Sequence, residues 1–331
     1  MTENTPMALT IEEITADFFD ASALKAQPIT LYRVDGGDSR WYYEPDKDHY
    51  YPSVTSKIQA VVPMAYGLFQ WCVSLGPDYV KIRDRKAAYG TWFHLAVQEI
   101  LIAGTFDFDA LADNLFVYSR TSGYPGAYDE WLRLARQDIL SFITFVRRHK
   151  VKPLAVEVIL ASDKNNHAGA VDLVCDMIIP LKGFHGEVYA GNSRTPGGPK
   201  IGDPKETTAW ITKRCLVDWK TRRTGFYESD EIQLHMYKEA WEEIYPDLPI
   251  DAIFSWHPTD WRTAPDFKLK NQTDTKSKAL LPHIHSMWDA MGKTEPSPSL
   301  VVSGQLTPDS DENDLFSFQA IKDTLEGAKD E

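Results

Sequence analysis

Cysteine is scarce in this chain of 331 residues, which has only Cys72, Cys175 and Cys215 and no C-x-x-C spacing. Three widely separated thiols form neither a disulfide framework nor a four-ligand metal cluster. Long apolar runs are also missing, because none approaches the roughly 20 residues that a membrane helix needs. No basic segment precedes an apolar stretch near residue 1. We therefore expect a cytoplasmic protein of a reducing compartment, with no membrane partner.

Positive charge is in the minority, with 35 Lys and Arg against 48 Asp and Glu, for a net charge of −13. The imbalance lies mainly at the ends: residues 1–20 hold five acids and no base, and residues 306–331 hold eight acids and two lysines. Between them stand basic clusters at 81–86, 147–152 and 213–223. A single basic cluster is usually a solvated face. The acidic total nevertheless does not exclude a nucleic-acid partner, because little of it lies in the middle of the chain.

The first half of the chain is mainly helical by its spacing. Residues 29–52 alternate aromatic and polar side chains around a Gly-Gly-Asp turn, which predicts a hairpin that leads into a helix starting at Ser53 or Thr55. Apolar residues then recur at helical spacing over about 56–103 and again over about 128–149. The second stretch ends in RRHK, and basic residues stabilise a helix C-terminus.

The second half of the chain has the pattern of a buried sheet. Four short apolar runs bounded by Gly, Pro, Asn or Asp predict strands at 154–162, 169–179, 214–221 and 251–257. Between the last two, residues 228–245 have an acidic start and helical spacing, so a helix crosses from one strand to the next. The predicted fold class is α/β, with a helical N-terminal flank.

Two further segments set the predicted domain boundaries. Residues 183–210 are rich in Gly and Pro and indicate a long insertion between two strands. Residues 277–292 predict a helix interrupted by Pro282, followed by the acidic tail. We therefore divide the chain into an N-terminal acidic segment with its hairpin, a core that contains the insertion, and a C-terminal helix with its tail, at 1–55, 56–265 and 266–331.

Charged side chains inside the apolar strands are the most informative feature, because burying an unpaired carboxylate costs several kcal/mol. Glu157, Asp172, Asp218 and Lys220 all interrupt such runs. The two-residue period of a strand places Asp218 and Lys220 on one face, with Trp219 on the other. A neighbouring strand that brings Asp172 beside Asp218 would place two carboxylates together, and a divalent cation such as Mg²⁺ or Mn²⁺ is the usual resolution of their repulsion.

Each of these signals has a plainer explanation when it is taken alone. Asp218 and Lys220 make an ordinary structural ion pair in many proteins. Gln233 and Tyr237 are four residues apart and share a helix face, which is typical of a polar surface. His94 lies in a mainly apolar helix, where a histidine is commonly a core residue.

The combination is more specific than its parts. Along the chain come GTWFH ending at His94, then Glu157, GAVD ending at Asp172, VDWK ending at Lys220, and QLHMY ending at Tyr237. Over about residues 50–260 this ordered set resembles the PD-(D/E)XK nuclease superfamily, and specifically its RecB-type branch, which includes CRISPR-adaptation nucleases and many phage exonucleases. YPSVTS at 51–56 is similar to the entry segment of phage-encoded members. The implied fold is a restriction-endonuclease-like core, a central mixed sheet flanked by helices.

The resemblance also implies roles for individual residues. Asp172 and Asp218 match the acidic metal ligands, with the Trp219 carbonyl completing the site, and His94 matches a histidine that ligates or supports the metal. Lys220 would position or activate the attacking water and stabilise charge on the phosphate. A strand glutamate that some members use near the metal corresponds to Glu157.

The implied substrate is DNA. Gln233 and Tyr237 match the Q-x-x-x-Y motif, which in the family contacts DNA and helps to arrange the site. Arg222 and Arg223 directly follow the lysine and could hold flanking phosphates, although a solvated face explains them equally well. The expected cofactor is Mg²⁺ or Mn²⁺, which lowers the pKa of bound water and stabilises the leaving oxygen. We expect no iron–sulfur cluster, because the four-cysteine pattern of several relatives is missing.

The function that we expect is that of a metal-dependent DNA exonuclease of phage type, acting without base-specific readout in recombination, replication or degradation of DNA. It would work in the host cytoplasm, and a recombination or replication protein is the partner that this role suggests. The alternatives are a structure-specific or restriction-like endonuclease of the same fold, a non-catalytic DNA-binding or assembly protein, and an unrelated α/β enzyme. One departure from the family stands out: Asp172 and Asp218 are separated by the 183–210 insertion where relatives commonly have a short hairpin.

Overall fold

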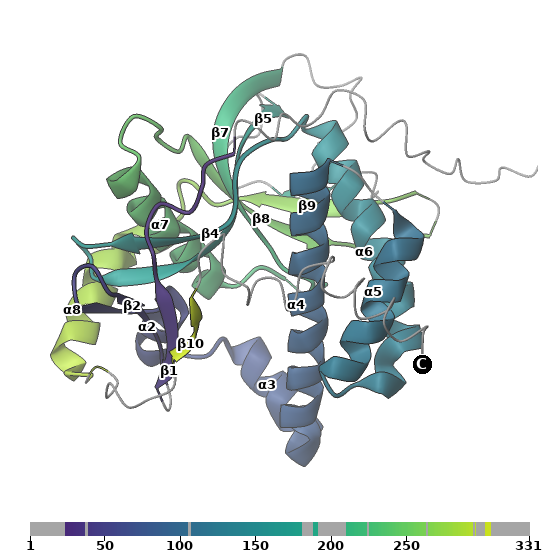
Figure 1. The fold of residues 1–331 in the computed structure, drawn as a ribbon, viewed down its shortest axis with the longest axis horizontal. Coiled ribbons are helices and arrows are strands. Elements are labelled where there is room, and N and C mark those ends of the chain that lie inside the picture. The colour runs from purple at the N-terminus through teal and green to yellow at the C-terminus, as the bar shows by residue number, and fades with distance from the viewer. Residues whose placement is uncertain are drawn as a thin grey trace, which may run out of the picture.

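The computed structural model describes residues 24–36, 39–104, 107–180, 188–190, 210–223, 225–262, 264–293, 295 and 302–305. These residues form two β-sheets and the helices that pack on them (Figure 1). The acidic ends at 1–20 and 306–331 lie outside the described residues, as does most of the predicted insertion at 183–210.

The bounds of the elements are as follows. The helices are α2 (Val54–Val61), α3 (Tyr66–Leu75), α4 (Tyr79–Ala103), α5 (Phe108–Thr121), α6 (Tyr128–Arg148), α7 (Glu228–Ile244) and α8 (Leu281–Met291). The strands are β1 (Tyr32–Gly36), β2 (Ser39–Glu44), β3 (His49–Pro52), β4 (Lys152–Ser162), β5 (His167–Pro180), β6 (Val188–Ala190), β7 (Trp210–Trp219), β8 (Ala252–Pro258), β9 (Phe267–Asn271) and β10 (Val302–Gln305).

The central sheet has the strand order β4-β5-β7-β8-β9-β6. It is mixed, because β7 and β8 run parallel and the other neighbours run antiparallel. Helix α7 connects the parallel pair, as a parallel connection requires. The four predicted strands are therefore confirmed as neighbours in one sheet, and so is the helix that crosses between the last two. The α/β class, with a mixed sheet flanked by helices, is confirmed with them.

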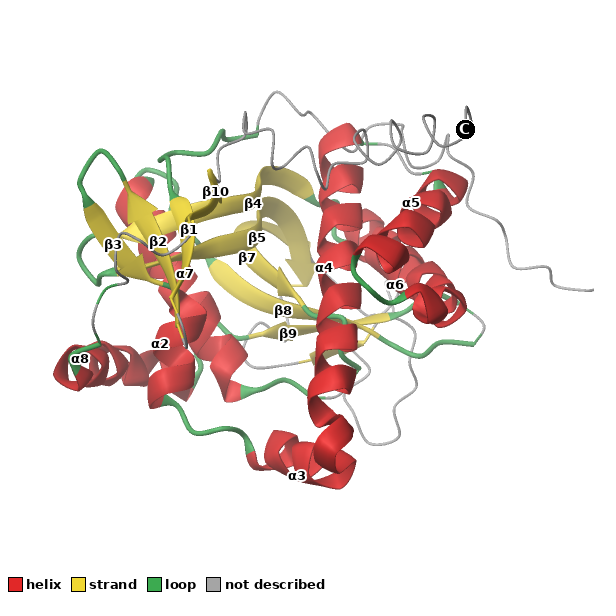
Figure 2. Cartoon of the chain, turned by 60° about the horizontal axis from the view of Figure 1, so that its bottom comes forward, coloured by secondary structure: helices red, strands yellow, loops and turns green. Residues whose placement is uncertain are grey.

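Helices cover both faces of this sheet (Figure 2). Helices α4, α5 and α6 bury an aromatic cluster against one face, where Phe93 and Phe142 pack on Trp219 and Trp256. Helices α2, α7 and α8 cover the opposite face with a mainly aliphatic cluster. Full burial of one such side chain contributes about 1.5–3 kcal/mol, so the two layers hold the sheet rigidly between them.

The smaller sheet has the order β10-β1-β2-β3 and contains the predicted hairpin. Ser53 ends this sheet and begins α2: its Oγ accepts a hydrogen bond from the Ser56 backbone N–H at 3.0 Å. Such a cap satisfies one of the free N–H groups of the first turn. The predicted helix start at Ser53 is thus confirmed. Pairing of β10 with β1 brings residues 302–305 back to the N-terminal sheet.

Some boundaries differ from the prediction. The helical stretch 56–103 is three helices, because the chain leaves the helical conformation around Pro63 and turns at Gly76 with φ +55°. The helix expected at 277–292 is a short 3-10 turn followed by α8, and Pro282 lies in the first turn of α8 rather than inside it. Proline suits that position because the first turn needs no N–H donor. Strand β9, which follows residue 265, belongs to the central sheet.

Among the described residues, no single helix is long and apolar enough to cross a membrane. The pair formed by α2 and the α3–α4 stretch passes the same criteria by length and composition, with a bend of 87° between its parts.

One close contact fixes how α7 lies on the sheet, and it yields a prediction. A Cβ added at Gly169 on β5 would lie 2.7 Å from Cε1 of the buried Tyr237 ring. We expect Gly169→Ala to lower the free energy of unfolding by about 1–3 kcal/mol in urea titrations, as overpacking does. Gly67→Ala on α3 is the matched control, because nothing lies within 4 Å of its added Cβ. Alanine there should raise helix stability by up to about 1 kcal/mol, and equal losses in both variants would contradict the account.

Candidate active site

Three carboxylates form a row across neighbouring strands of the central sheet. The register of β4 and β5 pairs the residues on either side of Glu157 with those on either side of Asp172, so these two lie opposite each other. In the next ladder Leu173 pairs with Val217, which places Asp218 beside Asp172. Opposite residues of antiparallel strands have their Cβ atoms about 4.5–5.5 Å apart. The predicted neighbourhood of Asp172 and Asp218 is confirmed, and Glu157 joins it.

At this row, the side chains of β4 and β5 change from one face of the sheet to the other. Glu157 has φ +49°, in the left-handed region that costs a non-glycine residue about 1–2 kcal/mol. On β4, Val156 packs in the cluster beneath α4–α6 and Val158 in the cluster beneath α7, although strand residues two apart normally share a face. On β5, Leu173 and Val171 make the same change. Strain of this kind persists where function requires a particular side-chain direction.

His94 closes the row from α4. Its Nδ1 lies 2.9 Å from Glu157 Oε1 and 3.6 Å from Asp172 Oδ1. One potential ligand atom from each of these three residues lies within 4.8 Å of the other two, a spacing that is compatible with a single bound metal ion. The structure therefore brings together the helix histidine and the strand carboxylates that the sequence places 63 residues or more apart.

Asp218 and Lys220 share a face, as predicted, and Lys220 Nζ donates to Asp218 Oδ1 at 2.7 Å. Asp218 is 1% exposed, and its Oδ2 is buried with no hydrogen-bond partner in the described part of the chain. Native structures rarely leave such an atom unsatisfied. A hard cation is the partner best suited to a carboxylate oxygen that lies beside two other carboxylates.

Trp219 faces the opposite side, with its ring centroid 5.8 Å from that of His94. Trp219 contributes to the site through its backbone N–H, which donates to Asp172 Oδ2 at 2.9 Å. This bond holds the Asp172 carboxylate in the row. A role of the Trp219 carbonyl as a metal ligand stays a prediction.

Burial and neighbouring charges shift the pKa values of Asp172, Asp218 and His94. Burial raises the pKa of Asp218 to about 6, against the opposing effect of the Lys220 ammonium. Burial also raises the pKa of Asp172, while the charge on His94 lowers it. For His94, burial alone would lower the pKa, but the carboxylates of Asp172 and Glu157 prevail and raise it to about 9. Without a cation, the site therefore retains protons near neutral pH that a bound metal would displace.

Gln233 and Tyr237 lie side by side on α7, as their spacing predicts. Gln233 Nε2 donates to Tyr237 Oη at 2.8 Å. Burial raises the pKa of the Tyr237 phenol well above its usual range, and the charges of Asp172 and Asp218 act in the same direction. The phenol therefore stays neutral beside the carboxylate row, as a hydrogen-bonding group requires. The structure leaves its contact with DNA untested.

Arg222 and Arg223 are held by carboxylates of the same chain. Arg222 pairs with Asp230 at the start of α7, and its guanidinium lies 4.4 Å from the Tyr227 ring centroid. Arg223 pairs with Asp138 of α6, a fully buried residue. These pairs fix the loop after Lys220 against α6 and α7. The predicted contacts of both arginines with phosphate remain a prediction.

One polar neighbour of the row was not singled out from the sequence. Ser255 on β8 lies beside Asp218 in the parallel ladder and is fully buried. It accepts a hydrogen bond from Gln272 Nε2 at 2.6 Å. The signal was a polar residue inside the apolar run 251–257, the same signal that identified Asp218.

A second group of potential ligands lies on the α2, α7 and α8 side of the sheet. His167, Glu239 and His285 also have ligand atoms within 4.8 Å of one another. The buried Lys57 ammonium, however, lies 3.4 Å from His285 Nδ1 and 2.9 Å from the Asn165 carbonyl. Burial lowers the pKa of Lys57 to about 8. A basic group already sits where a metal would bring a second positive charge, so we interpret this group as a structural network.

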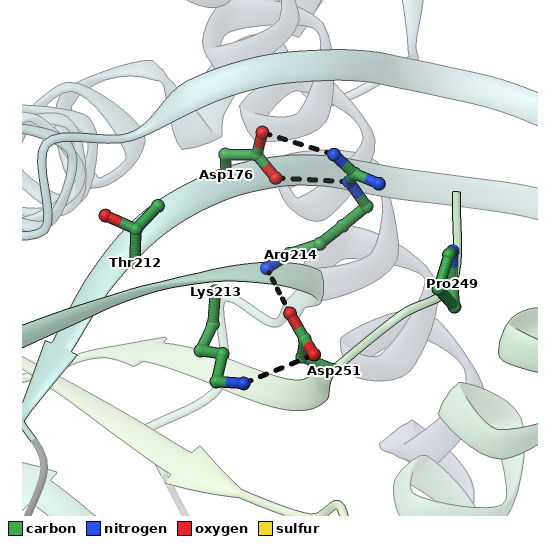
Figure 3. Close-up of a pocket in the computed structure, with 6 residues that line it drawn as sticks. All are labelled: Asp176, Thr212, Lys213, Arg214, Pro249 and Asp251. Carbon is green, nitrogen blue, oxygen red and sulfur yellow. Dashed lines mark hydrogen bonds and ion pairs between the residues drawn. The ribbon is translucent and has the colours of Figure 1, made fainter. Parts of the chain in front are cut away.

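A surface pocket of about 300 Å³ lies further along β5 and β7 (Figure 3). Its charges are satisfied within its own lining: Arg214 Nε lies 3.1 Å from Asp176 Oδ1, and Lys213 Nζ lies 3.3 Å from Asp251 Oδ1. None of the row residues lines it. The carboxylate row is therefore the stronger candidate for a functional site.

Comparisons with known proteins add no family to this description. No family model matches the chain, and no curated protein matches its sequence. The functional argument accordingly depends on the geometry of the row and on the motifs that the sequence carries.

The row predicts a gain in stability when one of its charges is removed. Because its pKa is raised to about 6, the Asp218 carboxyl favours the folded state below its unfolded pKa of about 4, and this contribution is lost as the pH rises through 6. At about pH 8, Asp218→Asn should raise the free energy of unfolding by about 1–3 kcal/mol. The gain should vanish below about pH 4.

The matched control is Asp176→Asn, further along the same sheet. Asp176 is paired with Arg214 at a half-buried position, so its loss should lower stability by no more than about 1 kcal/mol. Chemical denaturation across this pH range measures both variants. Destabilisation by Asp218→Asn at alkaline pH would show that the carboxylate is satisfied in the folded protein and would remove the argument for a cation.

Proposed function

We propose that this protein is a metal-dependent nuclease of the PD-(D/E)XK type that hydrolyses phosphodiester bonds of DNA. The observation that supports this most directly is the row of Glu157, Asp172 and Asp218, with Lys220 paired to the end of the row and one buried carboxylate oxygen left without a partner. The mixed sheet with its α7 crossover is compatible with the core of that superfamily.

The residues present fit a divalent cation. Asp172 and Asp218 offer hard carboxylate oxygens, and Glu157 and His94 lie within reach of the first of them. Oxygen-rich sites of this kind suit Mg²⁺ or Mn²⁺. When bound, such an ion makes its water a better nucleophile and stabilises the oxygen that leaves.

Lys220 is the group that we place closest to the reacting phosphate. Its ammonium extends from the end of β7 and is held 2.7 Å from Asp218 Oδ1, so its position is fixed by the carboxylate row. From there it orients the attacking water and offsets the negative charge that develops on the phosphate. Its backbone N–H donates to the Trp256 carbonyl at 3.0 Å, which anchors the residue where the strand ends.

His94 and the Gln233–Tyr237 pair serve the same site from two helices. His94 holds Glu157 by a hydrogen bond, and it must lose a proton before it can ligate a cation. The neutral Tyr237 phenol is available to hydrogen-bond a phosphate oxygen or a bound water. We assign His94, Gln233 and Tyr237 to the arrangement of the site. We assign the proton transfer itself to Lys220, Asp218 and Asp172.

The exonuclease mode, a phage-type role in recombination, replication or degradation of DNA, and a cytoplasmic location follow from the resemblance of the motifs. An endonuclease of the same fold is the nearest alternative. A DNA-binding protein without catalysis is the alternative of another class, and the complete set of His94, Asp172, Asp218 and Lys220 argues against it.

The test uses end-labelled linear DNA and closed circular DNA, single- and double-stranded, with Mg²⁺, Mn²⁺ or EDTA. We expect metal-dependent loss of linear DNA, and a loss of rate of about a hundredfold or more in Lys220→Ala and Asp218→Asn, since each removes charge stabilisation from the reaction. Arg214→Ala, in the unrelated pocket, is the control and should retain activity.

Each outcome of this assay supports one of the three functions: exonuclease, endonuclease or non-catalytic DNA-binding protein. Sparing of circles establishes the exonuclease, and cutting of circles establishes the endonuclease. Binding of DNA without hydrolysis by wild type, under every metal condition, would contradict the proposed activity and favour the non-catalytic protein.

A further inference from the structure

Asp138 on α6 joins the helix that carries His94 to the loop that follows Lys220. Its side chain is fully buried, and its carboxylate accepts hydrogen bonds from two sides. Oδ2 accepts from the Tyr89 hydroxyl on α4 at 2.8 Å, and Oδ1 accepts from Nη2 of Arg223 in the loop. One carboxylate thus connects two elements that each supply a residue to the candidate active site.

The Tyr89 contact fixes the part of α4 that leads to His94. The Tyr89 ring is buried, and its centroid lies 5.9 Å from those of Trp92 and Trp131. His94 lies between one and two turns further along the same helix. Burial raises the pKa of the Tyr89 phenol well above its usual range, so the hydroxyl keeps its proton and remains a donor to Asp138.

The Arg223 contact fixes the loop after Lys220. Each nitrogen of the Arg223 guanidinium donates within the chain, to Asp138, to Asp260 and to the Thr221 carbonyl. Because these bonds use the planar fork of the side chain, few of its N–H groups remain for a phosphate. The bonds hold the loop against α6 instead.

The start of the same loop is enclosed by two other elements. The Lys220 backbone N–H donates to the Trp256 carbonyl on β8 at 3.0 Å. Thr221 Oγ1 would lie 3.5 Å from a Cβ at Gly90 on α4, which is ordinary van der Waals distance. The loop therefore contacts α4 and β8 at its start, and the pairing with α6 holds its other end.

Near neutral pH, Asp138 carries the negative charge that pairs with Arg223. Burial raises the pKa of the Asp138 carboxyl to about 6. Arg223 and the Tyr89 hydroxyl act against this rise, and the nearby Asp260 carboxylate adds to it. Removing either partner of a buried pair leaves the other charge uncompensated. A change at Asp138 or at Arg223 should therefore release the loop from α6.

We propose that Asp138 and Arg223 act as one unit that positions Lys220 and His94 for the reaction, and that Arg223 does not bind phosphate directly. This inference rests on the proposed nuclease function, because the residues that are positioned belong to that site. Misplacement of a reacting group by about 1 Å can lower a rate by about a hundredfold. Loss of either partner should therefore slow the chemical step while the carboxylate row still binds metal.

The experiment measures hydrolysis of bis(p-nitrophenyl) phosphate with Mn²⁺ at about pH 7.5 in Asp138→Asn, Arg223→Gln and the double variant. This small ester has no flanking phosphates, so its turnover reports on the site alone. We expect kcat to fall about tenfold or more in each single variant, with KM and the calorimetric affinity for Mn²⁺ within about twofold of wild type. Because the two residues act as one unit, the double variant should lose no more than either single variant.

The matched control is Arg214→Gln, which makes the same change in another ion pair of the chain. The side chains of Arg214 and Arg223 are 23% and 20% exposed, and Arg214 pairs with Asp176, away from the carboxylate row. Its kcat should stay within about twofold of wild type. An equal loss in this control, wild-type kcat in either single variant, or additive losses in the double variant would overturn the proposal.

Arg223→Lys tests the proposal even if Asp138→Asn fails to fold. Lysine preserves the positive charge that pairs with Asp138, so this variant should retain more of the wild-type kcat than Arg223→Gln. A loss as large as that of Arg223→Gln would contradict a role through the buried pair.

Direct binding of phosphate by Arg223 would give a different result. Arg223→Gln would then leave kcat on the small ester unchanged. It would instead weaken the binding of DNA in EDTA and lower the slope of log affinity against log salt. That outcome would overturn the positioning role.

Hydrogen exchange separates this inference from the nuclease function, because exchange of the backbone amides at 220–223 reports whether the loop is held. Wild type could hydrolyse neither the ester nor DNA, while the amides exchange about tenfold faster in Asp138→Asn and Arg223→Gln but not in Arg214→Gln. The proposed function would then fail, and the anchoring of the loop would stand. If wild type is active and both variants keep wild-type exchange and kcat, the positioning role fails alone.

Discussion

The burial of several carboxylates side by side is the constraint on which the site depends. Glu157, Asp172 and Asp218 occupy neighbouring strands of the central sheet, and burial together with neighbouring carboxylates raises the pKa values of Asp172 and Asp218. His94 and Lys220 offset part of this cost at the two ends of the row. What they leave is a buried oxygen of Asp218 without a partner. We propose that a divalent cation coordinates that oxygen and also offsets the repulsion among the carboxylates, at the cost of stability in the metal-free protein.

The rest of the fold serves to hold this row in place. The aromatic layer beneath α4 and α6 fixes the helix that carries His94, and α7 presses Tyr237 against β5 at a position where only glycine fits. The left-handed backbone at Glu157 turns β4 over so that its carboxylate meets the histidine. A larger side chain at Gly169 would therefore displace Tyr237 or α7 from the sheet.

Much of this arrangement was predictable from the sequence, for identifiable reasons. Strands 154–162, 169–179, 214–221 and 251–257 are mainly apolar, so the charged residues inside them, such as Glu157, Asp172 and Asp218, were conspicuous. The alternation along the third strand correctly predicted that Asp218 and Lys220 share a face. The spacing of Gln233 and Tyr237 likewise gave their contact.

Other features depend on contacts between distant parts of the chain, which periodicity does not encode. Helix α5 is different: no element was predicted for 108–121, although its buried residues Leu111, Leu115 and Tyr118 recur at helical spacing after the Asp107 N-cap. The pairing of β10 with β1 and the addition of β9 to the sheet join segments far apart in sequence. The Gly169–Tyr237 contact and the carboxylates that hold Arg222 and Arg223 were also beyond local pattern.

The most direct test of the central claim is calorimetric titration of the purified protein with Mn²⁺ at about pH 7.5 in two buffers of different ionisation enthalpy. The account predicts saturable binding with release of a proton, because His94 has a pKa raised to about 9 and must become neutral to ligate. Asp218→Asn should weaken binding strongly, and His285→Ala, in the second histidine group, should not. Absence of Mn²⁺ binding by wild type, or binding that is lost in His285→Ala but retained in Asp218→Asn, would contradict the assignment of the carboxylate row as a metal-dependent catalytic site.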